Sequence, residues 1–393
     1  MANVSSSNGL EKRPKLRFPG FDEPWSIYKA EELFKNVADK NHPMETVLTI
    51  IQGKGTLPRE QAGRNIHYDD ASLANYKKVE QGDFIIHLRS FEGGLEMANE
   101  DGIVSPAYTI LRCKKPHSSL FYEAYFHTDE FINHILSKSV EGIRDGRQIS
   151  YEAFKWLGLP YCDVSEQERI AQLFCTLSHR IEKQQQMVDA LKKYKRGVVA
   201  AIFSHQLKFS DATGNPYPEW TSCTLQDAVD FLDGQRKPLE SADRAKRQGQ
   251  YPYYGASGII DYIDDFIFDE PLLLLGEDGA NILNRSTPLC FIAEGKYWVN
   301  NHAHVMRPKA GQNIKFLCEL LESLDYTRYN TGTAQPKLNQ DKCRRIGLAL
   351  PVYEEQCHIA DFLSAFDQRT DKAQSILDYL LSNRDGLLQQ LFI

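Results

Sequence analysis

One spacing in the second half of the chain is compatible with metal-dependent phosphodiester hydrolysis. Asp278 precedes Glu294 and Lys296, and two acids with a lysine can hold a divalent cation and activate a water. This pattern is short and arises often by chance, so a solvated turn is the simpler interpretation. His302 and His304 alternate, which would place them on one face of a strand, but no third metal ligand is evident. We therefore expect hydrogen-bonded histidines and no metal site.

Other catalytic signatures are missing from the sequence. It contains no G-x-x-x-x-G-K-[ST] and no G-x-G-x-x-G, so it offers no glycine-rich phosphate cradle. It has no Pro-Pro dipeptide, which excludes the [DNS]-P-P-[YFW] motif with which amino-methyltransferases hold a flipped base. The eight cysteines form no C-x-x-C pair, so a zinc knuckle or a disulfide framework is not indicated. We expect no catalytic residues in this chain.

Length, composition and charge are those of a globular protein with two or three domains. The chain has 393 residues, 42% hydrophobic and 25% charged. Its longest aliphatic run, 272–275, is far shorter than the roughly 20 residues that span a bilayer, so we expect a cytoplasmic protein. The net charge of −7 alone argues weakly against a nucleic-acid partner. However, segment 166–208 is net basic and segment 354–393 net acidic, so the two could pair.

An internal repeat organises the chain. The segment 166–174 (EQERIAQLF) matches 355–363 (EQCHIADFL), and the match continues without a gap to the end of the chain. Both copies follow a Leu-Pro step. An upstream marker, an aromatic segment followed by Pro and Trp, also occurs twice, at 16–25 and 207–220. The chain is therefore a tandem duplication in which each unit is a globular part followed by a C-terminal segment.

The two C-terminal segments have the heptad pattern of long helices. Apolar residues recur at alternating steps of four and three, which predicts a seam where two helices pack. The opposite charges of the segments favour their packing on each other. Lys195 and Arg384 hold the same seam position, and we expect their stems to pack, with helix register as a secondary role. The predicted spacer residues are Ile170, Phe174, Leu177, Ile181, Val188, Leu191, Val198, Ile202, Ile359, Leu363, Phe366, Leu377, Leu380, Leu387 and Leu391.

The globular parts contain short β-like runs, many aromatic residues and turn dipeptides such as Asp-Gly. We therefore expect an α+β protein with two mixed α/β domains, at 1–158 and 220–350. The helical segments occupy 159–208 and 351–393, and 209–219 is a turn-rich linker. The predicted architecture is a tandem pseudo-two-fold repeat in which a long antiparallel two-helix coiled coil separates the domains.

This organisation resembles the specificity subunit of type I restriction-modification systems. The resemblance covers nearly the whole chain and depends on the order of several short motifs. In the second half these are 253–260 (YYGASGII), 275–279 (LGEDG), 298–305 (WVNNHAHV) and 332–338 (GTAQPKL). In the first half, 88–94 (LRSFEGG) and 102–108 (GIVSPAY) are similar to another variant of the family's target-recognition domains.

The resemblance implies a non-catalytic DNA-binding protein. Each globular domain would read one half of a split target in double-stranded DNA, and the coiled coil would set the gap and dock two methylation subunits. Restriction subunits would complete the complex. Methylation, translocation and cleavage would belong to the partners, which would carry S-adenosylmethionine, ATP and Mg²⁺, so that this chain binds no cofactor.

Side chains able to read base edges or phosphates cluster in the expected loops, beside glycines that allow close approach. The candidate DNA-binding residues are Gln52, Lys54, Arg59, Arg64, Arg89, Ser90, Arg144, Arg147, Gln148, Arg236, Lys237, Ser257, Asn300, Asn301, His302, Thr333, Gln335 and Lys337. Two alternatives stay open from the residues alone. One is an enzyme, either a Mg²⁺-dependent nuclease using Asp278, Glu294 and Lys296 or a methyltransferase of unrecognised type. The other is a purely structural coiled-coil scaffold.

Overall fold

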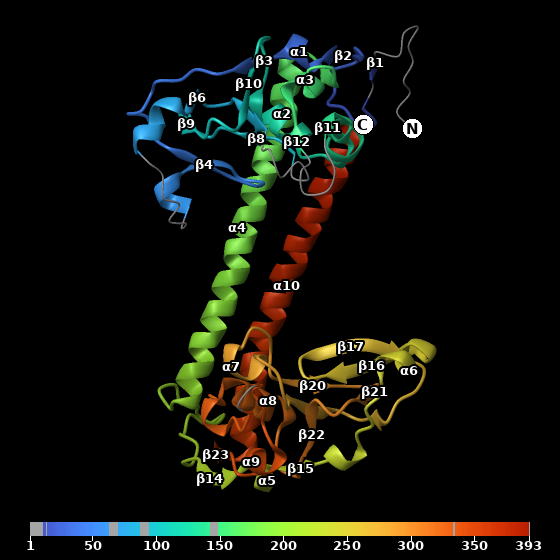
Figure 1. The fold of residues 1–393 in the computed structure, drawn as a ribbon. Coiled ribbons are helices and arrows are strands. Elements are labelled where there is room, and N and C mark those ends of the chain that lie inside the picture. Colours follow the sequence, from blue (N-terminus) through green and yellow to red (C-terminus); the bar gives the residue numbers. More distant parts are fainter. Residues whose placement is uncertain are drawn as a thin grey trace. The chain divides into compact units, whose positions relative to one another are not determined.

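The computed structural model describes residues 11–12, 14–62, 70–86, 94–141, 148–332 and 335–392. Internal contacts divide the chain into two compact units, residues 1–185 with 375–393, and residues 186–374. Each unit combines one globular part with a stretch of each long helix, as the colours of Figure 1 show. Among the described residues, no helix has both the length and the apolar character needed to cross a membrane.

Two helices of 40 residues confirm the long helices predicted from the heptad seam. They are α4 (Val164–Phe203) and α10 (Tyr353–Phe392). The first helix is shorter than the segment 159–208, because that segment opens with a strand in which Pro160 is paired. Asp163 then starts the helix, since its carboxylate accepts a 2.8 Å hydrogen bond from the Ser165 amide. After Phe203 the chain turns at His205, whose φ is 61°.

The globular part of the first unit is built from small antiparallel sheets. The central one has the order β3-β10-β7-β8 and a second has the order β1-β2-β13. The strands of these two sheets are β1 (Glu11–Lys12), β2 (Trp25–Lys29), β3 (Phe34–Val37), β7 (Phe84–Ile86), β8 (Glu96–Met97), β10 (Thr109–Cys113) and β13 (Gly158–Tyr161). Three two-stranded pairs complete it: β4 (Leu48–Ile51) with β5 (Gly55–Pro58), β6 (Lys77–Val79) with β9 (Gly102–Val104), and β11 (Val140–Glu141) with β12 (Gln148–Ile149).

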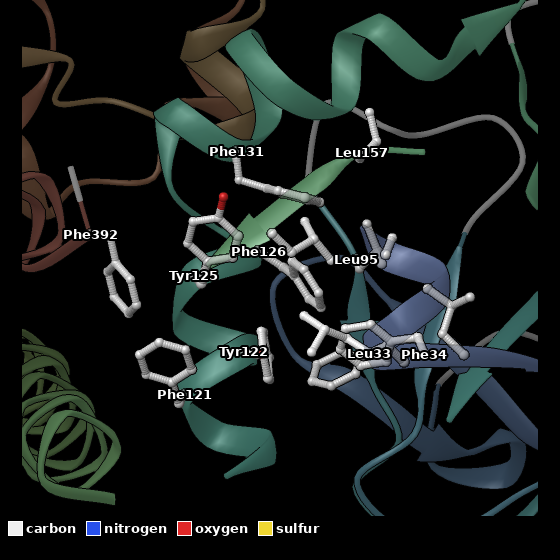
Figure 2. Packing of buried hydrophobic residues seen from close by; sticks show 14 of the residues in the cluster. Leu33, Phe34, Leu95, Phe121, Tyr122, Tyr125, Phe126, Phe131, Leu157 and Phe392 are labelled. Carbon is white, nitrogen blue, oxygen red and sulfur yellow. The ribbon is translucent and has the colours of Figure 1, made fainter. Parts of the chain in front are cut away.

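Short helices cover these sheets, and one of them is rich in buried aromatic residues. The helices are α1 (Ala30–Leu33), α2 (Ser119–Phe126), α3 (Tyr151–Phe154), the 3-10 helices η1 (Arg59–Ala62), η2 (Asp70–Asn75) and η5 (Leu136–Ser139), and the π-helix η4 (Glu130–Ile135). Helix α2 buries four aromatic side chains (Figure 2). The ring centroid of Phe126 lies 4.9 Å from that of Phe84 and 4.7 Å from that of Phe131. Phe392, the end of α10, enters the same cluster 5.2 Å from Phe121. The last turn of α10 is thus held by the core of the first unit.

The second unit contains two four-stranded sheets and one strand pair. Their orders are β15-β22-β19-β20, β17-β16-β21-β18 and β14-β23. The strands are β14 (Thr221–Thr224), β15 (Val229–Phe231), β16 (Gln248–Gly255), β17 (Gly258–Ile263), β18 (Phe268–Asp269), β19 (Leu272–Gly276), β20 (Cys290–Ala293), β21 (Lys296–Val299), β22 (Ala303–Pro308) and β23 (Gly347–Leu350). The helices are α5 (Leu225–Ala228), η7 (Asp233–Gln235), α6 (Ser241–Lys246), α7 (Asn281–Asn284), α8 (Ile314–Ser323), η8 (Thr327–Tyr329) and α9 (Gln340–Arg344).

The predicted duplication is visible in the topology of both units. In each, a strand at the start of the globular part pairs antiparallel with the strand that precedes the long helix: β2 with β13, and β14 with β23. In each, a short helix then leads into a four-stranded sheet of the same order, because β10 lies between β3 and β7 as β22 lies between β15 and β19. The sheet β17-β16-β21-β18 is an addition particular to the second unit among the described residues.

Candidate nucleic-acid interface

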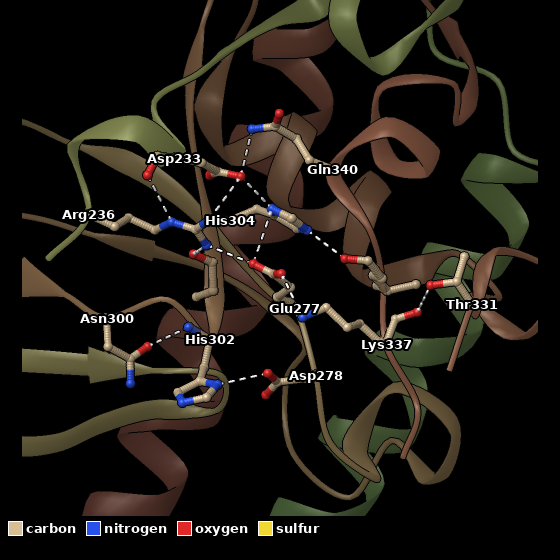
Figure 3. A network of polar contacts seen from close by, with 12 residues as sticks. Asp233, Arg236, Glu277, Asp278, Asn300, His302, His304, Thr331, Lys337 and Gln340 are labelled. Carbon is tan, nitrogen blue, oxygen red and sulfur yellow. Dashed lines mark hydrogen bonds and ion pairs between the residues drawn. The ribbon is translucent and has the colours of Figure 1, made fainter. Parts of the chain in front are cut away.

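Several loops of the second unit converge on a buried polar network at one end of its central sheet (Figure 3). The loops follow β15, β19 and β21, and residues 335–338 join them. Glu277 donates its amide to the His302 carbonyl and accepts the Leu338 amide at its own carbonyl, at 2.8 and 2.7 Å. Asp278 forms an isolated bridge with Lys337. The backbone alone therefore ties three loops together.

His304 is the centre of this network. It is 1% exposed; its Nδ1 lies 2.7 Å from Asp233 Oδ2 and its Nε2 lies 2.8 Å from the Leu338 carbonyl oxygen. Burial alone would lower the pKa of His304, but the hydrogen bond with Asp233 outweighs it and raises the pKa to about 10. Because both ring nitrogens face acceptors, both donate, and the imidazole is positively charged at neutral pH.

The protonated state of His304 bears on metal binding. Asp233, Glu277 and His304 come within metal-ligand distance of one another. A histidine ligates through a neutral nitrogen lone pair, and the two hydrogen bonds of His304 leave none. Glu277 is instead matched by Arg236 at 2.8 Å and by Lys337 at 3.2 Å. Two carboxylates facing three cations make this cluster an ion-pair network that braces the loops.

The predicted DNA-binding residues of the second half form two groups. Residues of the inner group use their side chains to hold the loops, and residues of the outer group have exposed side chains. Arg236 is inner: besides Glu277, its guanidinium donates to the Ala303 carbonyl at 2.7 Å. Asn300 is 5% exposed and its side chain accepts the His302 amide, so it shapes its own loop. The outer group, with exposed side chains, comprises Lys237, Ser257, Asn301, His302, Gln335 and Lys337.

The outer group surrounds the loop that carries Asn301. His302 is half exposed, and its Nδ1 lies 2.7 Å from Asp278. Ser257 sits in the turn between β16 and β17, and this turn lies against the end of β19, since a Cβ on Gly276 would come within 2.6 Å of the Ala256 carbonyl oxygen. Close approach of the two backbones thus requires glycine at position 276. The structure brings the turn of Ser257 to the same edge as the other loops.

In the first half, two of the predicted residues lie on one turn. Gln52 and Lys54 are exposed in the tight turn between β4 and β5, whose glycines donate their amides to Glu96. Gly53 donates to Oε1 at 2.7 Å and Gly55 to Oε2 at 2.9 Å. Burial would raise the pKa of Glu96, but His127 and these amides lower it, so the carboxylate stays ionised and holds the turn. Arg59, half-buried, opens η1 after β5.

Several predicted residues cannot be placed. Gln148 lies in β12, but its side chain belongs to the undescribed part of the chain. The remaining predictions that fall outside the described residues are Arg64, Arg89, Ser90, Arg144, Arg147 and Thr333.

The residues of the nuclease hypothesis lie apart. Ala293, next to Glu294, pairs with Leu272 at the start of β19, whereas Asp278 follows the end of that strand. Six residues of extended chain separate the two positions by about 20 Å. The Lys296 ammonium lies over the ring of Phe266, at 4.6 Å from its centroid. These three groups therefore cannot share one metal ion or one phosphate in this fold.

All fifteen predicted spacer residues are buried or half-buried in α4 and α10. In the first unit Phe174 stacks on Phe392 at 6.0 Å, and in the second unit Tyr194 lies 5.6 Å from Phe366. Within each unit, the start of one helix thus packs on the end of the other, as in an antiparallel pair. Lys195 does more than pack: its Nζ lies 2.6 Å from Glu319 of α8 and 2.7 Å from Asp367 of α10.

Sequence reasoning missed the acidic residues that organise the loops. In the sequence, Asp233 belongs to a turn dipeptide and Glu277 to a short motif, and neither pattern assigns them a role. Both lie too far from His304 in sequence for a motif to connect them with it. One general rule points to such acids: the ring nitrogens of a buried histidine need hydrogen-bond partners, and a carboxylate can be one of them. Glu96 had no signal, because its partners Gly53 and Gly55 lie more than 40 residues away.

Comparisons with known proteins agree with this structure. Residues 217–380 match the family described as type I restriction modification DNA specificity domain. A protein named as a type I restriction enzyme specificity subunit, from Haemophilus influenzae, is 32% identical over 155 residues, which is 39% of this chain and 38% of that protein. The EcoprrI specificity subunit of Escherichia coli is 28% identical over 39% of this chain and 37% of its own length. The matched segments therefore span less than two fifths of these curated relatives.

Two solved structures share the fold over almost the whole chain. The S subunit of a type I restriction-modification system from M. genitalium superimposes with a TM-score of 0.61, covering 97% of this chain and 99% of that one, at 16% identity. A chain from a structure on assembly and conformational transition of the type I R-M system gives 0.57, over 96% and 99%, at 13% identity. Residues 217–380 of this chain are therefore similar to the type I restriction modification DNA specificity domain, and the fold of the chain is similar to that of these two solved structures.

Proposed function

We propose that this chain is the DNA sequence-recognition subunit of a type I restriction-modification complex and catalyses no reaction itself. The observation that carries this proposal is the set of converging loops in the second unit, which lies in the segment that matches the specificity domain. These loops present exposed amide, hydroxyl, imidazole and ammonium groups, the types that bond base edges and phosphates. Asn301, Gln335 and Lys237 belong to the exposed outer group, and their amide and ammonium groups are suited to direct readout.

The network beneath the loops suits them to recognition. Loops that are ordered before binding lose less conformational entropy when they contact DNA. Here His304 and Glu277 fix four loop segments through ion pairs and backbone hydrogen bonds before any partner arrives. Lys337 then has two roles: it neutralises Glu277 and leaves a half-exposed ammonium for phosphate contact.

The first unit would read the other half of a split target. Its candidate reading element is the exposed turn of Gln52 and Lys54, held in place by Glu96. A rigid glycine turn that projects two polar side chains is suited to groove or phosphate contacts. The two units have equivalent topology, which supports equivalent roles.

The partners belong to the same proposal. Helices α4 and α10 of 40 residues each would be about 60 Å long, and we propose that they set the gap between the half-sites and dock two methylation subunits. Exposed apolar side chains on the helices, such as Met187 and Tyr194, are suited to this docking. The methylation subunits would supply S-adenosylmethionine, and restriction subunits would supply ATP- and Mg²⁺-dependent translocation and cleavage.

The test is reconstitution with the methylation subunits. The complex should methylate one bipartite motif in a randomised DNA pool, and the methylation subunits without this chain should lose that selectivity. The purified chain with DNA and Mg²⁺ should release no cleavage product. Cleavage by the chain alone would favour an enzyme, and a complex that assembles without any site preference would favour a structural scaffold.

A further inference from the structure

The Glu-Gln pair that marks the sequence repeat forms the same buried joint in both units. In the first unit, Gln167 is 0% exposed and lies in the first turns of α4. Its Nε2 donates to the Cys162 carbonyl at 2.9 Å, and its Oε1 accepts the Ser118 amide at 3.0 Å. Ser118 is the N-cap residue of α2, the helix that carries the aromatic core.

The second unit repeats both hydrogen bonds at equivalent places. Gln356 is 1% exposed, donates to the Pro351 carbonyl at 3.0 Å and accepts the Asn313 amide at 2.9 Å. Asn313 is the N-cap residue of α8, whose apolar face fills the core of this unit. One buried side chain thus connects three segments in each half: the strand end before the long helix, the long helix itself, and the start of the core helix.

Only an amide side chain fits both partners. One of them is a carbonyl acceptor and the other an N–H donor, so the side chain must donate at one end and accept at the other. A carboxylate could accept the amide but would face the carbonyl with no hydrogen to donate. An alanine would leave a buried N–H and a buried carbonyl without this partner, which is costly.

The neighbouring glutamate adds a second connection to the joint. Glu166 accepts the Trp25 indole N–H at 3.0 Å, and Trp25 is the first residue of β2, the strand that pairs with β13. In the second unit, Trp220, just before β14, lies close enough to Glu355 to counteract the rise that burial causes in the pKa of Glu355. The two markers found by sequence comparison, Glu-Gln and the upstream Trp, therefore meet in space in each unit.

We propose that Gln167 and Gln356 are positioning residues that fix the orientation of each recognition domain on its long helix, and so the spacing at which its half-site is read. This inference rests on the proposed function. Each core helix starts at the joint, so loss of the two hydrogen bonds frees its end to tilt against the long helix while its apolar face stays packed. The loops that contact bases are far from the joint in sequence and keep their own bracing.

The experiment measures gap preference with the complete chain assembled with its methylation subunits. The DNA pool carries both half-sites separated by gaps one base pair shorter, equal or longer. Gln167→Ala and Gln356→Ala should each lower the preference for the wild-type gap over its neighbours by about tenfold, with both half-site sequences unchanged, since each change removes the two equivalent buried hydrogen bonds. Gln356→Ala also removes a 3.0 Å hydrogen bond from Gln356 Nε2 to Gln312 Oε1. Gln172→Ala and Gln368→Ala, at exposed positions on the same helices, are the matched controls and should retain the preference.

A second measurement does not depend on activity. Hydrogen exchange at the Ser118 amide should accelerate in Gln167→Ala, and at the Asn313 amide in Gln356→Ala. Gln167→Glu and Gln356→Glu retain size and one hydrogen bond, and replace the alanine variants if those fail to assemble. Lower thermal stability with an unchanged gap preference would overturn the proposal, as would loss of half-site sequence preference. If the wild-type complex shows no bipartite preference, the proposed function fails, and hydrogen exchange still tests the joint.

Discussion

Replacing Lys195 by methionine should loosen the packing of α4, α8 and α10 in the second unit. The Lys195 ammonium lies 2.6 Å from Glu319 and 2.7 Å from Asp367, so it connects three helices through two ion pairs. Burial would lower the pKa of Lys195, but the two carboxylates raise it, which shows that the charged form is stabilised in place. Methionine keeps the apolar stem in the seam and removes only the charge.

The expected loss of unfolding free energy is about 2 kcal/mol. Glu319 and Asp367 are 22% and 48% exposed, so solvent screens each ion pair to about 0.5–1 kcal/mol. Removing the ammonium also leaves two carboxylates facing each other, and their repulsion adds a comparable amount. For a unit of this size, the midpoint of thermal unfolding should fall by about 4–8 °C.

Thermal unfolding of the complete chain at low and high salt measures this effect. Lys193→Met, at an exposed position of the same helix, is the control and should change the unfolding free energy by less than about 0.5 kcal/mol. A double-mutant cycle with Glu319→Gln should give a coupling of about 1 kcal/mol that shrinks in salt. A Lys195→Met chain as stable as the wild type, with no coupling, would refute the bridge as a stabilising contact.

Four further predictions concern three buried ionisable groups and the length of the helices. The pKa of His304 is raised to about 10, so the stabilisation that its protonated form gives the folded state is complete below about pH 6.5 and is lost as the pH rises towards 10. Over that range the unfolding free energy should fall by up to about 1.4 kcal/mol per pH unit. Denaturation of His304→Gln at the same pH values should not show this slope. Glu166→Gln, which breaks the paired hydrogen bonds from Arg17, should cost about 3 kcal/mol in denaturant unfolding. No arginine among the described residues pairs with Glu355, and burial raises the pKa of its carboxyl. Its ionised form therefore opposes folding as the pH rises, and Glu355→Gln should leave stability at pH 7 equal or higher. A loss equal to that of Glu166→Gln would contradict this difference. Inserting four residues after Ala190 should lengthen the methylated gap by one or two base pairs, and an unchanged gap in an assembled complex would exclude the helices as the ruler.

Much of the fold was predictable because the spacing of apolar residues and the internal repeat both indicate it directly. The heptad seam predicted both long helices to within a few residues, since a seam residue is set by its neighbours three and four positions away. The repeat predicted equivalent topology in the two halves. The residue at which α4 begins was harder to predict from the sequence. The strand that precedes it contains Pro160 and pairs with β2, which lies more than 100 residues upstream.

The site was predictable in composition but not in the roles of its residues. The exposed positions of Asn301 and Gln335 agree with polar residues in loops, whereas Arg236 and Asn300 turn inward. An arginine that reads a base and an arginine that braces a loop look alike in sequence. Which one is present depends on whether an acid such as Glu277 is brought within reach, and that is a property of the tertiary fold.

The most direct test of the central claim is an exchange of recognition domains followed by sequencing of methylated DNA. Residues 20–155 would be replaced by the equivalent segment of a specificity subunit with a different target, and the chimera assembled with the same methylation subunits. Two independent readers on a common pair of helices predict that one half of the methylated motif changes, while the other half and the gap stay as they were. A motif altered in both halves, or an unaltered motif, would contradict this account.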